Sequence, residues 1–333
     1  MSGRIAVILF LVGVLSVLGG ALIGPVPLAP GEVLSALGLG SQADEALRLI
    51  VVDIRLSRSV LAWLVGAGLG ASGAVLQGLL RNPLADPFTL GVSSGAAFGV
   101  ALTVYLGLGT TLFGALGVLT PAAVIGALGT LGLVLVLARM AGGLRRETMI
   151  LAGIVTATFL AALISLIKAL DEESVTAIVF WIMGSLQGRG WAHVFLYLPW
   201  WVVGMILVWR LGLELDLLNL GSGQAQQMGV DAERSRLWLL LGAGILAGAG
   251  VAVSGVIGFV GLVVPHFVRL FQGREHRPLI LSSALAGGVL LLWSDVAART
   301  LLPRGGELPV GVVTALVGGP AFWAILCRRM GRE

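Results

Sequence analysis

The sequence predicts an all-α protein that crosses a membrane about ten times. Of its 333 residues, 57% are hydrophobic and only 11% are charged, and the mean hydropathy is +1.02, which exceeds what a soluble domain needs. Apolar runs of roughly 20 residues, the length of a membrane-spanning helix, recur along most of the chain. An internal duplication of the sequence further predicts that the helices form two related halves.

The apolar runs define ten expected spans, at residues 5–24, 57–79, 91–108, 113–138, 148–169, 192–211, 236–256, 258–272, 279–302 and 310–327. The first run could be a signal peptide. It is longer than the usual signal core of about 7–15 residues, however, and only Arg4 precedes it, so we expect a retained span. A short amphipathic helix is expected after Asp171, between the fifth and sixth spans.

Arginine placement accounts for the pI of about 10.2. With the N-terminus inside, the inner flanks of the spans carry 14 of the 21 Lys and Arg residues and the outer flanks carry 7. This asymmetry is the positive-inside bias of membrane proteins. It predicts that both termini are cytoplasmic and that the partner of the basic residues is membrane lipid, not nucleic acid.

Glycine is abundant, with 50 residues, and small residues let helices approach closely in lipid. Gly66 and Gly70, like Gly244 and Gly248, are four residues apart and share a helix face. We expect them to pack helices within one bundle, the alternative being a dedicated dimerisation motif.

Two single residues limit the chemistry of the chain. The one cysteine, Cys327, excludes a disulfide framework and a cysteine metal site. The sole lysine, Lys168, lacks the Gly-Lys-Ser/Thr context of a P-loop. Any ATP-driven work therefore requires a partner subunit.

The duplication is visible in two pairs of segments. RSVLAWLVGAGLGA at 58–71 matches RSRLWLLLGAGILA at 234–247, and GIVTA at 153–157 matches GVVTA at 311–315. Chance is the alternative, because Gly, Ala and Leu are common here, but both pairs occur in the same order. The matched spans are five apart and must run in opposite directions. We expect one domain, 1–333, with inverted repeats at about 55–169 and 234–327, an arrangement typical of transporters.

The stretch RLSRSVLAWLVGAGLGASGAVLQGLLRNPLADPFTLGVSSG at 55–95, together with the chain from Gly221 onward, resembles the FecCD-type permeases of ABC importers. These move ferric siderophores, haem and cobalamin. The resemblance implies a type II importer permease in the bacterial inner membrane, with spans 2–5 and 7–10 as the repeats. It also implies a homodimer, two ATPase subunits that hold ATP and Mg, and a periplasmic binding protein, with no catalysis and no cofactor in this chain.

The same resemblance assigns roles to particular residues. Arg55, Arg58 and Arg299 would dock acidic patches of the binding protein; alternatively they snorkel to lipid headgroups, or Arg299 pairs with Asp295, four residues earlier. Spans five and ten would line the substrate pathway, although plain helix packing, with Thr bonded to its own helix, is equally compatible. The pathway residues are Gly153, Thr156, Ala157, Leu160, Gly311, Thr314 and Ala315.

Two inner segments complete the assignment. The proline-bounded turn after span two would form a cytoplasmic gate through Asn82 and Leu84. The opposing side of the gate would be Arg146 and Glu147, where the resemblance leads us to expect small hydroxylic residues instead. The loop 212–235 would contact the ATPase, unless it is a plain linker, through a short helix and the glycine that ends it. These coupling residues are Gln224, Ala225, Gln227, Met228, Gly229 and Val230.

Other functional classes find less support. No Asp/Glu/His series suggests the proton relay that an ion- or proton-coupled secondary transporter would use, although such transporters also contain inverted repeats. No His, Cys or Asp constellation indicates a membrane enzyme. His266 could bind haem or a metal, but a lone histidine on an apolar helix is more often a packed side chain.

Overall fold

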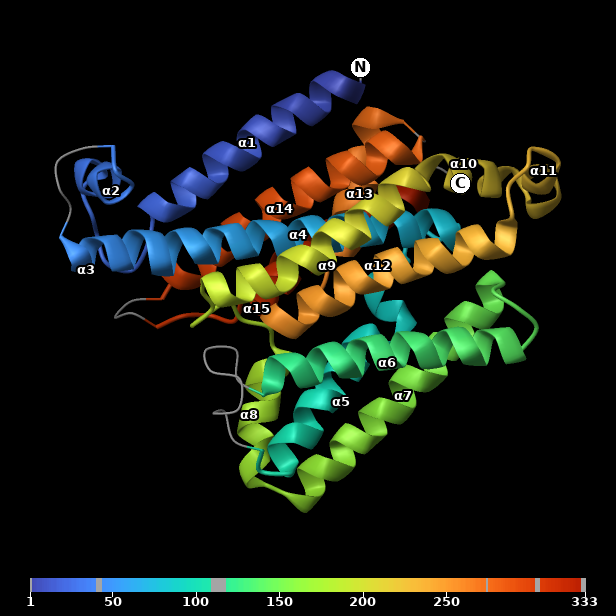
Figure 1. Cartoon of the computed structure of the whole chain (residues 1–333), viewed down its shortest axis with the longest axis horizontal. Helices are drawn as coiled ribbons and strands as arrows, with labels where there is room; N and C mark the ends of the chain where they lie inside the picture. Colours follow the sequence, from blue (N-terminus) through green and yellow to red (C-terminus); the bar gives the residue numbers. More distant parts are fainter. Residues whose placement is uncertain (1, 40–43, 109–117, 274, 303–305, 331–333) are drawn as a thin grey trace.

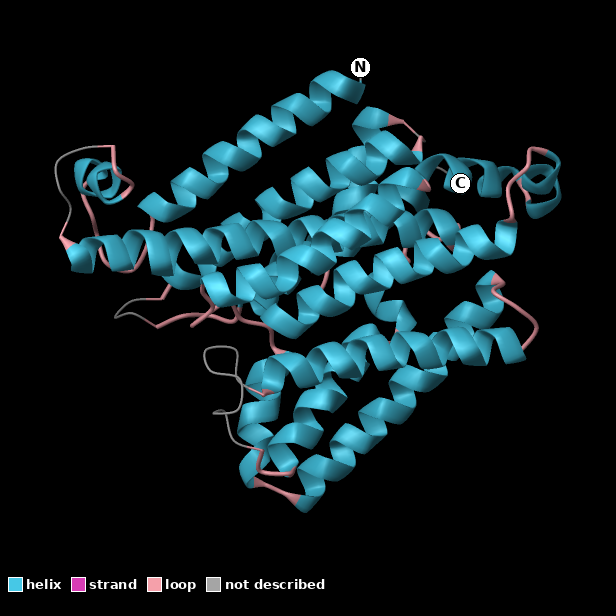
Figure 2. Cartoon of the chain, in the orientation of Figure 1, coloured by secondary structure: helices cyan, strands magenta, loops and turns pink. Residues whose placement is uncertain are grey.

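The computed structural model describes residues 2–39, 44–108, 118–273, 275–302 and 306–330, and in these ranges it contains helices and no strands (Figures 1 and 2). A helix occupies each of the ten expected spans. They are α1 (Ser2–Leu22), α4 (Ser57–Leu79), α5 (Val92–Tyr105), α6 (Leu119–Met140), α7 (Arg146–Leu170), α9 (Trp191–Arg210), α12 (Ala232–Ser254), α13 (Val260–Gln272), α14 (His276–Thr300) and α15 (Val310–Met330).

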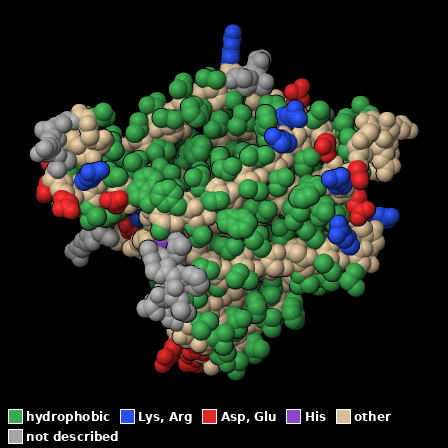
Figure 3. Space-filling view, in the orientation of Figure 1, with side chains coloured by type: hydrophobic (Ala, Val, Ile, Leu, Met, Phe, Trp, Pro, Cys, Tyr) green, Lys and Arg blue, Asp and Glu red, His purple; other side chains and the backbone are tan. Residues whose placement is uncertain are grey.

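The remaining helices lie at the two ends of the bundle. One end carries α2 (Pro30–Ala36), α3 (Glu45–Arg48), the π-helical stretch Leu49–Leu56 and α8 (Glu173–Ile182), the short helix expected after Asp171. The other end carries both chain termini, α10 (Gly212–Leu220) and α11 (Ser222–Gln227) (Figure 1). We call these the outer and inner ends. The surface between them is mostly hydrophobic, and charged side chains gather toward the ends (Figure 3).

Helix α4 is the centre of the bundle. It contacts α14, α12, α13 and α9, and almost all its side chains are buried. Glycines bring its neighbours close: a Cβ added at Gly66 would lie 2.3 Å from the Gly287 carbonyl oxygen of α14, and one at Gly70 would lie 2.2 Å from that of Ser283. Gly244 and Gly248 likewise face Leu131 of α6 and Val92 of α5. All four glycines therefore pack helices of the same chain, as expected.

The helices α5 to α8 form a second group, which packs on α12 through α5 and α6 (Figure 1). Helices α4 and α12, which carry the first pair of matched segments, are each 23 residues long and run in opposite directions (Figure 1). Their followers, α5 and α13, are both short, with 14 and 13 residues. The residue before each helix has a left-handed backbone conformation: Gly91 (φ 72°) before α5 and Phe259 (φ 68°) before α13.

Two of the ten expected spans are too short to cross the membrane by themselves. At 1.5 Å per residue, α5 and α13 reach only about 20 Å, less than the roughly 30 Å of hydrocarbon. Among the described residues, seven helices are long and apolar enough to cross alone. Irregular backbone at membrane depth is tolerated where protein buries it, and paired short segments in two repeats are typical of transporters.

The close contact of α4 with α14 yields the first testable expectation. Substituting Gly66→Ala places a methyl group against the Gly287 carbonyl, which forces the two helices apart and lowers the free energy of unfolding by about 1–3 kcal/mol. The thermal midpoint of the purified protein in detergent measures this loss.

Gly129→Ala is the matched control, because Gly129 lies in α6 and nothing lies within 4 Å of an added Cβ. Alanine there removes only the helix penalty of glycine, so the midpoint should hold or rise. Equal midpoints for the two variants would contradict the packing role of Gly66.

Candidate functional sites at the two ends of the bundle

An ion cluster lies at the outer end of α4. The Arg58 guanidinium donates from Nε to both carboxylate oxygens of Asp295 in α14, at 3.1 and 3.0 Å, and from Nη2 to Oδ1 at 2.9 Å. Its Nη1 donates to Glu307, in the segment before α15, at 2.8 Å. The side chains of Arg58 and Asp295 are only 8% and 1% exposed. The paired hydrogen bonds between Arg58 and Asp295 offset the cost of removing both charges from water.

Two further arginines bind the end of α1. Arg55 donates to the carbonyl oxygens of Leu22, at 3.1 Å, and Val26. Arg299 donates to that of Gly20 at 2.9 Å, and its Nε lies 3.7 Å from Asp295. The last carbonyls of a helix lack partners within the helix and carry partial negative charge, so cations suit this position.

These contacts bear on the predicted docking of a binding protein. Arg55, Arg58 and Arg299 are 3%, 6% and 3% exposed, and their guanidinium groups point into the chain. The expected alternative of an Asp295–Arg299 contact is present, at the 3.7 Å given above. Docking by these three side chains stays a prediction, and their burial argues against direct contact with a partner.

The inner turn between α4 and α5 is held by its own side chains. Asn82 Oδ1 accepts from the Leu84 N–H at 2.9 Å, and Asp86 Oδ1 accepts from the Phe88 N–H at 3.0 Å. Burial raises the pKa of the Asp86 carboxyl to about 6, and the Phe88 N–H opposes the rise. Pro87 follows at the start of a 3₁₀ turn, Pro87–Leu90. The turn is therefore structured, as the two prolines predicted.

The predicted gate residues lie around this turn and at the start of α7. Leu84 and Glu147 are exposed, and Asn82 and Arg146 are half-buried. Burial lowers the pKa of Arg81, and the positive charges of Arg146 and Arg236 lower it further. Gating by Asn82, Leu84, Arg146 and Glu147 stays a prediction.

The segment expected to contact an ATPase forms a short helix, α11. The Val230 N–H bonds the Ala225 carbonyl at 2.9 Å, the Gly229 N–H bonds that of Gln226 at 3.0 Å, and Gly229 is left-handed (φ 83°). This is a Schellman ending. Ala225 is buried and Val230 half-buried, whereas Gln224, Gln227, Met228 and Gly229 are exposed. The exposed residues are available to a partner.

Helix α10 was missed by the sequence analysis, which treated residues 212–235 as a loop with one short helix. Asp216 of α10 accepts from the backbone N–H of His276, the first residue of α14, at 3.2 Å, and contacts its Nδ1 at 2.5 Å. Arg81, after α4, donates to the Leu218 carbonyl at 2.8 Å. Ser235 of α12 donates to Glu214. Polar contacts thus join α10 to three central helices. The buried pair Leu215 and Leu218, at i, i+3 spacing, was the available signal for this helix.

The FecCD transport family matches residues 8–328, nearly the whole chain. The chain belongs to this family. One relative is the haemin transport system permease protein HmuU of Yersinia pestis, which is 40% identical over 299 residues, 88% of each chain. Another is the ABC transporter permease protein YvrB of Bacillus subtilis (strain 168). It is 46% identical over 283 residues, 84% of this chain and 79% of YvrB. A solved inward-facing metal-chelate type ABC transporter is 32% identical, with a TM-score of 0.86 over 98% of this chain and 99% of that one.

The expected pathway residues of this FecCD chain lie mainly against its own helices. On α7, Gly153 meets the Thr89 carbonyl, with 2.2 Å to an added Cβ, and Thr156 and Leu160 are buried. Ala157 is half-buried. On α15, Thr314 bonds the carbonyl of Gly311 at 3.0 Å, whereas Ala315 is exposed. The pathway role stays a prediction.

The exposed faces of the two helices were not selected from sequence. They are the faces a second subunit or a cargo could reach, and they carry Leu151, Ile154, Val155 and Phe159 on α7 and Leu316, Val317 and Trp323 on α15. Apolar residues cover all sides of both helices, so periodicity gave no means of choosing a face. Within the described ranges, no group of three or more His, Cys, Asp or Glu side chains is arranged to hold a metal ion.

The ion cluster yields the second expectation. Asp295→Ala leaves Arg58 with only Glu307 and removes the carboxylate beside Arg299, so the free energy of unfolding should fall by about 3–5 kcal/mol. Thermal unfolding in detergent measures it, and Asp53→Ala, which removes an exposed carboxylate five residues before Arg58, serves as the control. A midpoint for Asp295→Ala equal to that of the control would show that the cluster adds nothing to stability.

Proposed function

We propose that this chain is the permease subunit of an ATP-driven importer that moves a metal chelate across the bacterial inner membrane. The observation that carries the proposal is the match over nearly the full length of both chains to a solved metal-chelate type ABC transporter. Relatives named for haemin, cobalamin and Fe(3+)-citrate transport agree with this cargo class.

The sequence defines what other subunits must supply. Because the chain lacks a P-loop, ATP and Mg bind to two copies of a partner ATPase, and this chain performs no covalent chemistry. A periplasmic binding protein delivers the cargo at the outer end. Two copies of the chain form the membrane unit, with the exposed faces of α7 and α15 toward the pathway, and the termini are cytoplasmic.

The inner end supplies a route for coupling. The exposed side of α11 contacts the ATPase, and α10 follows it because the two helices are joined at Gly221. Movement of α10 reaches α4, α12 and α14 through the contacts of Arg81, Ser235 and His276 described above. ATP binding and hydrolysis thereby alternate the outward- and inward-open states.

Purification of the tagged chain in mild detergent from its native host tests the function. We expect an ATPase and a binding protein to co-purify, and the complex in liposomes to take up haemin, cyanocobalamin or ferric citrate only when ATP is supplied. A chain that remains alone and transports without ATP would be a secondary transporter instead.

The coupling role of α11 gives a third expectation. Met228→Glu places a charge on the exposed, partner-facing side of α11, so cargo-stimulated ATP hydrolysis and uptake should fall at least tenfold while the chain still assembles in the membrane. An uptake and ATPase assay of the reconstituted complex measures both activities. Leu39→Glu is the control, because Leu39 is also exposed but lies at the outer end, beyond the reach of an ATPase. Equal activities for both variants would remove α11 from the interface.

A further inference from the structure

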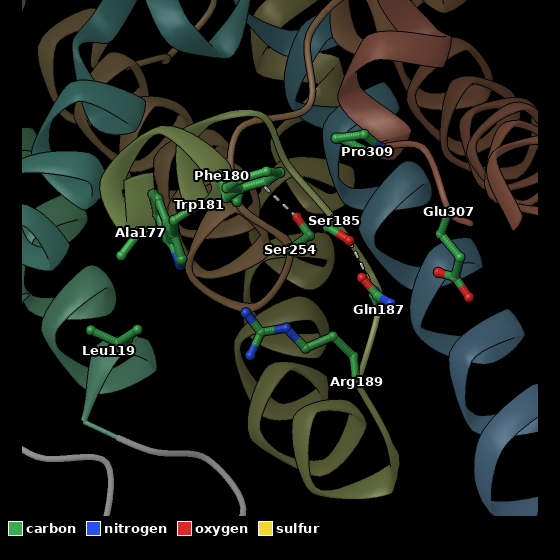
Figure 4. A pocket seen from close by; sticks show the side chains of 11 residues that line it. Leu119, Ala177, Phe180, Trp181, Ser185, Gln187, Arg189, Ser254, Glu307 and Pro309 are labelled. Atoms are coloured by element: carbon green, nitrogen blue, oxygen red, sulfur yellow. Dashed lines mark hydrogen bonds between the residues drawn. The ribbon is translucent and has the colours of Figure 1, made fainter. Parts of the chain in front are cut away.

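A cavity of about 380 Å³ opens at the outer end of the bundle (Figure 4). Its wall comes from the end of α8, the segment between α8 and α9, the end of α12 and the segment before α15. Pro309, directly before the first residue of α15, lines it, as do Trp181 and the exposed Gln187. The cavity therefore lies at the outer end of a helix that we expect to line the pathway.

Closely packed backbone fixes the shape of this cavity. The Ser185 N–H bonds the Ser254 carbonyl at 2.8 Å, and the Gly311 N–H bonds that of Gly184 at 3.3 Å. A Cβ added at Gly255 would lie 2.4 Å from the Trp181 carbonyl oxygen, and one at Gly311 would lie 2.3 Å from that of Met183. Three chain segments thus meet with no room for side chains between them, so that packed backbone forms part of the cavity wall.

The cavity contains an arginine whose charge is not balanced. Among the described residues, no carboxylate lies within 4 Å of the Arg189 guanidinium, and its Nε has no hydrogen-bond partner. The acidic residue of the lining, Glu307, is already paired with Arg58 at 2.8 Å. Figure 4 shows Arg189 and Trp181 extending toward the same space, with Glu307 on the opposite side.

The two groups next to Arg189 carry no negative charge, and one of them has a free hydrogen-bond donor. Arg189 Nη1 lies 2.9 Å from Nε2 of His193, and because arginine only donates, this nitrogen must accept and the ring is neutral. The indole N–H of Trp181, a side chain that is 9% exposed, is buried without a partner. Burial lowers the pKa of Arg189, as expected for a cation that lacks an anion.

We propose that this cavity is an anion-recognition subsite, in which Arg189 binds a carboxylate of the incoming cargo. The inference rests on the proposed function and narrows the cargo to chelates that carry carboxylate groups. The planar guanidinium offers paired N–H donors that match the two oxygens of such a group.

Haemin and its dimethyl ester form the probe pair, because they differ only in whether the two carboxylates are free; ferric citrate is a second carboxylate probe. We would measure their binding to the full chain in lipid nanodiscs, without the binding protein. The wild-type chain should bind haemin or ferric citrate, and Arg189→Gln should weaken that binding roughly 10- to 100-fold, the range of a charge-assisted hydrogen bond. Haemin dimethyl ester should bind both chains equally and weakly.

Gln187→Ala is the matched control, since it alters a neutral side chain of the same cavity and should change affinity less than twofold. Arg189→Lys should keep part of the affinity, and an unchanged thermal midpoint shows that each variant is folded. The proposal fails if Arg189→Gln binds haemin and ferric citrate like wild type, if wild type binds neither, or if the ester is affected as strongly as the acid. ATP-driven uptake of cyanocobalamin alone would overturn this subsite and leave the importer function intact, whereas carboxylate binding without ATP-driven uptake would overturn the function.

Discussion

Hydrocarbon offers no hydrogen-bond partner to a peptide group, and the arrangement of this chain depends on that constraint. The backbone N–H and C=O groups must therefore form hydrogen bonds within helices. Contact between helices is stabilising mainly where small residues let the backbones pack closely. Helix α4 meets the requirement at the centre, where Gly66 and Gly70 lie against the backbone of α14. The other helices are arranged around this contact, and the most peripheral, α1, leaves most of its surface to lipid.

Because hydrocarbon also disfavours charged side chains, the ionic contacts lie at the two ends of the helix bundle. At the outer end, Arg58 and Asp295 are buried but neutralise each other, and Arg55 and Arg299 bind carbonyl groups at the end of α1. At the inner end, Asp216 and Arg81 tie α10 to the ends of α14 and α4. The central helices are thus held by paired charges at the outer end and are joined at the inner end to α10, which leads into the exposed helix α11.

The sequence predicted local features well, because hydropathy and turn residues act over short distances. The ten apolar helices, the helix after Asp171, α11 with its terminal Gly229 and the packing role of Gly66 are all present. What it could not predict depends on partners far apart in the chain. Arg58 and Asp295 are separated by 237 residues, so the burial of Arg58 was not foreseen. Arg189 was likewise not selected, because its isolation is a property of the folded cavity.

Hydrogen–deuterium exchange of the assembled complex, with and without ATP and Mg, tests most directly whether α4 stays closely packed at the centre while the transporter moves. We expect ATP to change exchange in α11, while the amides of α4 from 57 to 79 stay protected. Changes in α4 as large as those in α11 would contradict this account, because the close contact of α4 with α14 would then open during transport.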